Sequence, residues 1–320
     1  MTPIPTFPQF RRLEIGDRPA IEAITRRVPP SSDFVFTSLW CWDTDETCVI
    51  ALLDGNLVVR FKDYAADTHF YSFFGDHAIA ETAQTLLAHA SRQGLPAQLK
   101  LIPESVVAAD DRLARRLSIT DDRDNWDYVY AIVDWAVLPG GPHRKHRQQV
   151  ARCRRQSALT FSLLDLRDVA VQAAIVDVSY RWAQQKPAAA GDDRRHELVA
   201  LRRLFALAGH ERLGACGLYK GRQLVGFSIW EVLPCQALAI AHFRKTDRSY
   251  DGLTTYLRHE ESRLLLARGC RFMNIEQDLG LAGLRRAKLS LRPCGFVRKY
   301  VISARPGQGT DSATTGRPGR

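Results

Sequence analysis

The sequence lacks the segments that mark a membrane or secreted protein. No run approaches the ~20 apolar residues of a membrane span, and the N-terminal stretch MTPIPTFPQFRRLEIGD has no apolar core between a basic start and a cleavage site. The seven cysteines include no C-x-x-C pair, which favours reduced, mostly buried thiols over a disulfide framework or a zinc site. We therefore expect a soluble, cytoplasmic protein with no transmembrane segment and no metal site.

Several catalytic signatures are missing as well. The segment from Gly226 to Trp230 lacks the second glycine of a nucleophile elbow, and there is no phosphate-binding Walker loop. His143 and His146 are spaced like a metal pair, but their surroundings are strongly basic. No Ser or Cys stands beside an evident base, so any group transfer should be direct, without a covalent enzyme intermediate.

Positive charge is abundant in this chain. The 45 Lys and Arg residues exceed the 35 Asp and Glu residues by 10, which favours a polyanionic partner such as RNA, a nucleotide cofactor or an anionic membrane surface. Much of this charge falls in HRKHRQQVARCRR, residues 143–155, which has six Arg or Lys and no acid. As a helix, this segment would keep only a thin packing stripe and could hold phosphates without reading sequence. The candidate nucleic-acid contacts are Arg144, Lys145, Arg147, Arg152 and Arg155. A solvated face, neutralised by the acidic residues between 110 and 127, is the alternative.

The length of 320 residues favours two domains. In the first half, Asp54-Gly55 between two β-rich runs predicts a hairpin. Further strands are expected at 69–73, 98–102 and 128–137, with a helix at 78–92. The Pro-Gly-Gly-Pro break at 139–142 marks a hinge. We predict an N-terminal domain at 1–138, a C-terminal domain at 139–303 that carries the active site, and a disordered Gly/Pro/Ser/Thr-rich tail at 304–320.

The second half repeats this order of elements. A strand at 159–164 and helices at 169–185 and 194–208 precede a hairpin at 216–232, a strand at 237–243, a helix at 253–268 and a strand at 271–275. Periodicity alone supports two mixed α/β halves. A hairpin, a strand, a loop, a long helix and a further strand resemble the middle of an acetyltransferase-type (GNAT) fold. The resemblance implies an α+β chain of two tandem GNAT-like domains, each a mixed, mostly antiparallel sheet flanked by helices.

The stretch NIEQDLGLAGLRRAKLSLRPCGFVRKY, residues 274–300, is the densest candidate site. Three polar residues follow an apolar strand: Asn274, Glu276 and Asp278. The next segment, as a helix, places Arg285, Lys288 and Arg292 on one stripe, beside an apolar arc that begins at Leu284. We expect the apolar arc to pack and the basic stripe to meet an anion; a solvated basic helix is the alternative. Pro293 ends the helix, so that Lys299 and Tyr300 return on an extended segment.

This stretch resembles the closing motif of the phosphatidylglycerol lysyltransferase C-terminal domain family, in which N-x-x-x-D-x-G, L-R-x-x-K, P and K-Y recur in that order. The segment WDYVYAIVDWAVLPGGPHRKHRQQVARCRR resembles that family's D-Y-x-Y strand and basic helix, and the likeness extends over roughly residues 10–303. The family is similar in fold to the Fem peptidyl transferases, tandem GNAT proteins that move an amino acid from aminoacyl-tRNA onto an amine or hydroxyl. The resemblance carries over these positions: Asn274, Asp278, Gly280, Leu284, Arg285, Lys288, Pro293, Lys299 and Tyr300.

The chain also departs from the family pattern. Ala241-His242-Phe243-Arg244 stands where the lysyltransferases tend to have Asp-Leu-Met-Arg. Arg244 is retained and the acid is absent, so specificity for lysine is not implied. The best-known members carry a multi-span membrane half that this sequence lacks, so a lipid acceptor is not implied either.

Aminoacyl transfer needs phosphate contacts, oxyanion stabilisation and a base. On the resemblance, Lys288 and Arg244 stabilise the oxyanion or the leaving ribose oxygen. Asp278 or Glu276 orients the α-amino group or acts as the base, and His242 is an alternative base that could equally be a satisfied core residue. The remaining substrate contacts are Arg285 and Lys299 for phosphate, with Asn274 and Tyr300 beside them.

We therefore expect an acyl or aminoacyl transferase that uses aminoacyl-tRNA as co-substrate and a small-molecule, peptide or lipid acceptor, and needs no cofactor. One alternative is an acyl-CoA-dependent N-acyltransferase. In such enzymes a loop of the form R/Q-x-x-G-x-G/A wraps pyrophosphate, and here Asp251 stands where the first glycine should be. The other alternative is a non-catalytic module that binds tRNA or another polyanion. Such a binder gains nothing from the acidic residues at 276 and 278.

Overall fold

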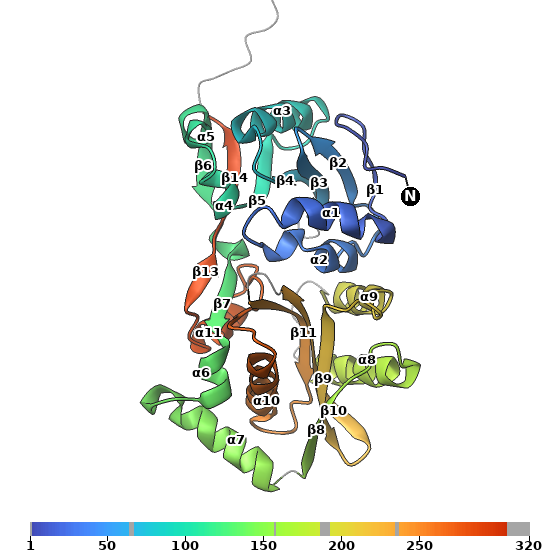
Figure 1. The fold of residues 1–320 in the computed structure, drawn as a ribbon, viewed down its shortest axis with the longest axis vertical. Helices are drawn as coiled ribbons and strands as arrows, with labels where there is room; N and C mark the ends of the chain where they lie inside the picture. Colours follow the sequence, from blue (N-terminus) through green and yellow to red (C-terminus); the bar gives the residue numbers. More distant parts are fainter. Residues whose placement is uncertain (1, 64–66, 157, 186–192, 234–236, 306–320) are drawn as a thin grey trace, which may run out of the picture.

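The computed structural model describes residues 2–63, 67–156, 158–185, 193–233 and 237–305, and Figure 1 gives the arrangement of their elements. Residues 306–320, most of the predicted tail, lie outside the described residues. Among the described residues, no helix has the length and apolar character needed to cross a bilayer.

The first half of the chain forms one mixed sheet with helices against it. Its elements are β1 (Arg11–Arg12), η1 (Ile15–Asp17), α1 (Arg18–Thr25), η2 (Ser32–Phe34), α2 (Phe36–Cys41), β2 (Val49–Leu53), β3 (Asn56–Asp63), β4 (Thr68–Phe74), α3 (Ile79–Arg92), β5 (Gln98–Pro103), α4 (Glu104–Val107), α5 (Asp111–Arg116), β6 (Leu117–Asp121) and η3 (Arg123–Asn125). The predicted hairpin is confirmed, since β2 pairs with β3 around Asp54 and Gly55. Both turn residues have positive φ, as a tight two-residue turn requires.

The second half forms a second mixed sheet. Its elements are β7 (Asp127–Ala131), α6 (Ile132–Val137), η4 (Gly141–His143), α7 (Arg144–Gln156), β8 (Leu159–Leu163), α8 (Val169–Gln184), α9 (Asp193–Phe205), β9 (Leu213–Lys220), β10 (Gln223–Leu233), β11 (Leu238–Thr246), α10 (Leu253–Ala267), β12 (Phe272–Asn274), α11 (Ala282–Ser290), β13 (Gly295–Val297) and β14 (Lys299–Ala304).

The two sheets repeat one topology. In the first, β2, β3 and β4 are antiparallel, α3 crosses over, and β5 pairs parallel with β4. In the second, β9, β10 and β11 are antiparallel, α10 crosses over, and β12 pairs parallel with β11. The predicted α+β fold of two GNAT-like units is thereby confirmed.

The two halves also exchange a strand. The first sheet has the order β1-β2-β3-β4-β5-β14-β6, and the second has the order β13-β7-β12-β11-β10-β9-β8. Thus β14, from the end of the described chain, lies between β5 and β6, while β7 lies beside β12 in the lower sheet of Figure 1. The predicted division after residue 138 therefore does not coincide with the division between the sheets, because strand exchange is a long-range pairing that local patterns do not encode.

Two local expectations were wrong. The strand predicted at 128–137 ends at Ala131, and the chain continues as α6, whose Trp135 is buried and donates through Nε1 to the carbonyl of Leu291 at 3.2 Å. The helix of the closing stretch ends at Ser290, so Arg292, with φ of 60°, lies outside the predicted basic stripe.

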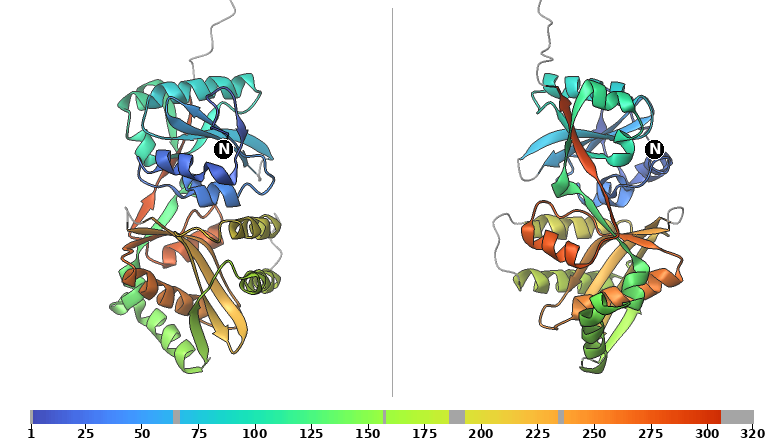
Figure 2. Two further views of the ribbon diagram at one scale, coloured as in Figure 1. Left: turned by 45° about the vertical axis from the view of Figure 1, so that its right-hand side comes forward. Right: turned by 90° about the vertical axis from the view of Figure 1, so that its left-hand side faces the viewer.

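The hydrophobic core joins the halves. One cluster contains Ile50 and Phe73 from the first sheet together with Ile175, Leu204 and Phe243 from the second unit. Figures 1 and 2 place α1 and α2 between the two sheets, facing α9 and the ends of β10 and β11. The junction between the halves is therefore packed, and the polar groups inside it are held by both.

Candidate active site

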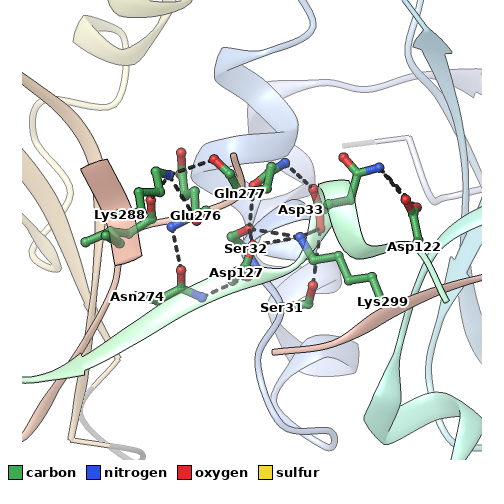
Figure 3. A network of polar contacts seen from close by, with 12 residues as sticks. Ser31, Ser32, Asp33, Asp122, Asp127, Asn274, Glu276, Gln277, Lys288 and Lys299 are labelled. Carbon is green, nitrogen blue, oxygen red and sulfur yellow. Dashed lines mark hydrogen bonds and ion pairs between the residues drawn. The ribbon is translucent and has the colours of Figure 1, made fainter. Parts of the chain in front are cut away.

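The loop after β12 is shaped by polar bonds to its own backbone. Asn274 Oδ1 accepts from the amide of Glu276 at 2.7 Å, and its Nδ2 donates to Asp127 Oδ2 at 2.8 Å. Lys288 Nζ, from α11, donates to the carbonyls of residues 275, 276 and 277 at 2.5, 3.0 and 2.6 Å (Figure 3). Positive φ at Glu276 turns these carbonyls towards the lysine. Lys288 thus fixes the loop, and its three N–H donors are already used.

The contacts of Lys288 correct the expected orientation of α11. The basic stripe faces the protein, while Leu284 on the supposed packing side is 37% exposed. Burial lowers the pKa of Lys288 to about 8, so the side chain is still mostly an ammonium at neutral pH. Its contacts give it a positioning role, since no donor remains for the oxyanion role expected from the sequence.

Asp278 is likewise fully engaged. Its carboxylate accepts from Arg285 at 2.8 and 3.0 Å, from Arg123 at 3.3 Å, from the amide of Gly280 at 2.9 Å, and from the hydroxyl of Tyr128. Burial opposes the charged form, but these donors outweigh it and lower the pKa of Asp278 to about 2. A carboxylate this acidic is a poor base. Arg285 pairs with Asp278 and also with Asp124. The two predicted site residues Asp278 and Arg285 are therefore bonded to each other.

Lys299 is buried and ion-paired. Its side chain is fully buried and contacts Asp127 Oδ1 at 2.7 Å and the carboxylate of Asp33. Burial favours the neutral amine, but the two carboxylates outweigh it and keep the pKa of Lys299 raised. Ser32 donates to Asp127 at 2.8 Å, completing a network from η2, β7 and β14 (Figure 3). The phosphate contact expected at Lys299 does not fit this burial, whereas Tyr300 beside it is half-buried and pairs through its backbone with Ile102 and Asp121.

His242 occupies an irregular position of the second sheet. The register between β10 and β11 shifts between Ile229 and Trp230, so His242 is the extra residue of a β-bulge. Beyond Ile240 and Asn274, β11 and β12 have no further paired residues, and the loop after β12 brings Glu276 to the imidazole. The bulge and the separation of these strands together place both side chains at the junction of the halves.

The imidazole lies between two carboxylates. His242 Nδ1 is 3.2 Å from Glu276 Oε1, and Nε2 is 3.6 Å from Glu231 Oε2. Burial alone would lower the pKa of His242, but the two carboxylates raise it to about 9. Glu231 in turn accepts from Arg18 of α1 at 2.9 Å. The imidazole is buried, whereas 17% of the Glu276 side chain is exposed, so Glu276 is the member of this group that solvent or a substrate reaches.

Arg244 belongs to a different environment. Its guanidinium donates to Glu261 of α10 and to Ser228 Oγ, the latter at 3.2 Å. None of these partners contacts the Asp278 carboxylate or the Lys288 ammonium. Of the three residues expected to be catalytic, Lys288 and Asp278 are therefore linked through Tyr128, whose ring lies 5.9 Å from Lys288 Nζ and whose hydroxyl donates to Asp278, whereas Arg244 belongs to a separate network.

The basic helix α7 packs as expected along one stripe. His146 lies on the Trp135 ring, with centroids 4.8 Å apart, while Val150 and Cys153 are buried in the second core. The predicted phosphate contacts divide into two groups. Arg147 donates to the carbonyls of Leu138 and Gly140, and Arg152 pairs with Asp251. By contrast, Arg144, Lys145 and Arg155 are exposed, and their side chains form no ion pair with the described residues. No ion pair within the described chain joins α7 to the acidic residues at 110–127.

Sequence reasoning missed the residues contributed by the first half. Arg18, Ser32 and Asp33 complete the junction networks, and Glu231 is the second carboxylate of His242. These partners are separated in sequence by up to 267 residues. Glu231 is the one charged residue in a mostly apolar strand, β10, and this local signal could have drawn attention to it.

The comparisons with known proteins agree with this architecture. The family model described as phosphatidylglycerol lysyltransferase, C-terminal, matches residues 25–303. A conserved protein of unknown function from Bacteroides thetaiotaomicron is 23% identical, with a TM-score of 0.77, over 92% of this chain and 99% of that one. L-PGS from Bacillus licheniformis is 13% identical, with a TM-score of 0.61, over 91% and 94%. FemX is 8% identical, with a TM-score of 0.55, over 92% and 96%. A search of curated proteins found no match. The fold, the closing motif and the extent of the family match together establish that this chain belongs to the phosphatidylglycerol lysyltransferase C-terminal domain family.

Proposed function

We propose that this protein transfers an aminoacyl group from aminoacyl-tRNA to an amine or hydroxyl of an acceptor. Its family supports an acyl or aminoacyl transferase, and the likeness to FemX supports a shared fold with a Fem protein. The choice of donor rests on one observation, the closed N-terminus of α10.

In a CoA-dependent enzyme of this fold, the amides that open this helix bind pyrophosphate. Here α7 packs on that turn: a Cβ built at Gly252 would lie 3.1 Å from Gln149 Cβ, and Thr255 Oγ1 donates to Gln149 at 3.0 Å. Asp251 adds a carboxylate, which pairs with Arg152 of α7. A covered and partly acidic turn disfavours pyrophosphate, and with it the acyl-CoA alternative.

The surface of α7 supports the tRNA donor instead. Arg144, Lys145 and Arg155 are exposed and have no carboxylate partner in the described chain, so they are available to phosphates. Contacts of this kind give affinity without sequence reading, which suits an enzyme that recognises the aminoacyl group rather than the RNA sequence.

The chemistry is assigned to Glu276. In direct transfer, the acceptor nitrogen or oxygen bonds to the ester carbonyl carbon, the bond to the ribose oxygen breaks, and the acceptor proton must be removed. Glu276 takes that proton, and His242 holds the carboxylate in place through the 3.2 Å contact at Nδ1. The released ribose oxygen takes a proton from solvent. Glu276 is thus the catalytic residue, while His242, Lys288 and Asn274 are positioning residues.

The first test is binding of charged tRNA, uncharged tRNA and acetyl-CoA over a salt series. We expect tRNA binding that prefers the charged form. Each phosphate contact contributes about 0.7–0.9 to the slope of log K against log salt. Replacing Arg144, Lys145 and Arg155 by Gln should therefore lower the slope by up to about 2–3. The matched control replaces three exposed arginines of the first half by Gln: Arg12, Arg92 and Arg115. Saturable acetyl-CoA binding without a preference for charged tRNA would refute the proposal.

A second test separates catalysis from binding. Glu276→Gln should lower turnover of aminoacyl-tRNA with a mixture of amine and hydroxyl acceptors by about 10²–10⁴-fold and leave tRNA affinity unchanged. Glu211→Gln, at an exposed site, is the control. Equal turnover in both variants would exclude Glu276 as the base. Binding of charged tRNA without turnover in the wild type would favour a binding module.

A further inference from the structure

Among the residues that the structure describes, the buried Arg and Lys side chains have carboxylate partners, with one exception. The paired ones are Arg18 with Glu22 and Glu231, Lys299 with Asp33 and Asp127, and Arg244 with Glu261. Arg258 on α10 is 9% exposed. No carboxylate of the described residues forms an ion pair with its guanidinium, its Nε is buried without a hydrogen-bond partner, and its side-chain hydrogen bond is to a neutral group, the Tyr130 hydroxyl.

The surroundings of Arg258 are positive. Its Cζ lies 4.7 Å from the centroid of the Trp135 ring, and Arg244 is a second guanidinium close enough to act on it. The one carboxylate in this region, Glu261, already accepts from Arg244 and from Ser228 at 2.7 Å. Burial, reinforced by Arg244, lowers the pKa of Arg258 to about 10. The guanidinium groups of Arg244 and Arg258 thus lie near one carboxylate, Glu261, which is already hydrogen-bonded to Arg244 and Ser228.

An unpaired charge in a protein interior is strongly destabilising, and contact with an aromatic ring offsets only part of this cost. A guanidinium without a carboxylate partner is also well suited to a planar or tetrahedral oxyanion, to which it can donate two parallel N–H bonds. We propose that Arg258, with Arg244 beside it, forms a subsite that binds one oxyanion, a phosphate or carboxylate group of a substrate.

The subsite lies beneath the basic helix. The Trp135 ring that contacts Arg258 also contacts His146 of α7, and α10 packs against both α6 and α7. Two sources of the oxyanion are compatible with this position: a phosphodiester at the 3′ end of an RNA bound along α7, or an anionic group of the acceptor. The proposal concerns the oxyanion itself and stands whether or not the donor is aminoacyl-tRNA.

The test compares wild type, Arg258→Met and Arg258→Lys in thermal unfolding with increasing inorganic phosphate and with chloride at matched ionic strength. Phosphate should raise the Tm of the wild type, partly raise that of Arg258→Lys, and leave that of Arg258→Met unchanged. Direct titration should give an affinity about ten- to a hundredfold weaker in Arg258→Met, the value of a charge-assisted hydrogen bond. Without phosphate, Arg258→Met should unfold at a higher temperature than wild type, because an uncompensated charge is gone. If Arg258 only stabilised the fold by packing on Trp135, Arg258→Met would instead unfold at a lower temperature than wild type.

Arg263→Met is the matched control. Arg263 lies on the same helix, is 56% exposed and pairs with Glu260, so its removal should leave the phosphate response intact. A competition experiment identifies the source of the oxyanion. If phosphate displaces intact tRNA but does not displace tRNA that lacks its 3′ CCA, the oxyanion belongs to the 3′ end of the RNA. Undisturbed tRNA binding assigns it to the acceptor. Equal phosphate stabilisation of wild type and Arg258→Met, or none in either, would overturn the proposal.

Discussion

Replacing Lys299 by Met should destabilise the junction between the halves. The lysine is fully buried, and its ammonium contacts Asp127 at 2.7 Å and Asp33. Met has similar length but no charge, so two buried carboxylates lose their cation. Removing one partner of a buried ion pair costs about 3–5 kcal/mol, and the mutual repulsion of the two carboxylates adds to this.

Urea unfolding of wild type and Lys299→Met measures this loss as a difference in the free energy of unfolding. Lys62→Met, which removes a cation at a more exposed pair with Asp45, should lower the free energy of unfolding far less, because solvent screens an exposed ion pair. Adding Asp127→Asn to Lys299→Met should recover part of the loss, because one unpaired charge disappears. A loss below about 1 kcal/mol in Lys299→Met, or strict additivity in the double variant, would refute the reasoning.

The same variant has a defined pH dependence. Burial already raises the pKa of Asp33 in the wild type, with Lys299 opposing that shift. Without the lysine, the folded-state pKa of Asp33 should rise further above the unfolded value of about 3.9. A raised folded-state pKa stabilises the fold below the unfolded pKa, and this stabilisation is lost as the pH rises through the folded pKa. The difference in the free energy of unfolding between wild type and Lys299→Met should therefore be largest at neutral pH and become smaller towards pH 4.

Further predictions concern the site loop, the bulge and α7. His242→Gln should flatten the pH dependence of stability: despite burial, neighbouring carboxylates raise the pKa of His242 to about 9, so its stabilisation is complete below about 6.5 and is lost as the pH rises through 9. Urea unfolding from pH 6 to 10 checks this, with exposed His77→Gln as control. Lys288→Met should cost about 2–4 kcal/mol in the same assay, because three carbonyls lose a charged donor, and a cost below 1 kcal/mol would contradict that role. Gly252→Ala should destabilise more than Gly94→Ala and also weaken tRNA binding, since both glycines have positive φ but only the first contacts α7; equal effects would exclude the contact.

The sequence predicted what is local in this fold. Turn signals such as Asp54-Gly55, helix spacing and the order of elements led to two GNAT-like units, and the closing motif led to the family. The orientation of α11 was wrong, because periodicity describes which side chains share a face but not which face turns inward. Lys288 turns inward because positive φ at Glu276 offers it carbonyls, a backbone property that residue patterns do not display. The roles expected of Arg244 and Asp278 depended on partners that only folding brings near.

Strand exchange explains why the site lies at the junction rather than within one GNAT-like unit. Because β7 leaves the first half to pair with β12, it carries Asp127 to the loop that holds Asn274. Because β14 returns to the first sheet, it carries Lys299 to the same carboxylate. Each half therefore supplies part of the bonding that shapes the other half's loop, and Glu276 owes its position to both. A fragment that begins after residue 138 would lack β7, Asp127 and Arg18, so the second sheet would lose the strand beside β12 and the Glu231–His242–Glu276 group would lose its guanidinium. The exchanged pair of sheets is accordingly one structural unit, and a chain cut at its apparent hinge would not retain the bonding around Glu231, His242 and Glu276.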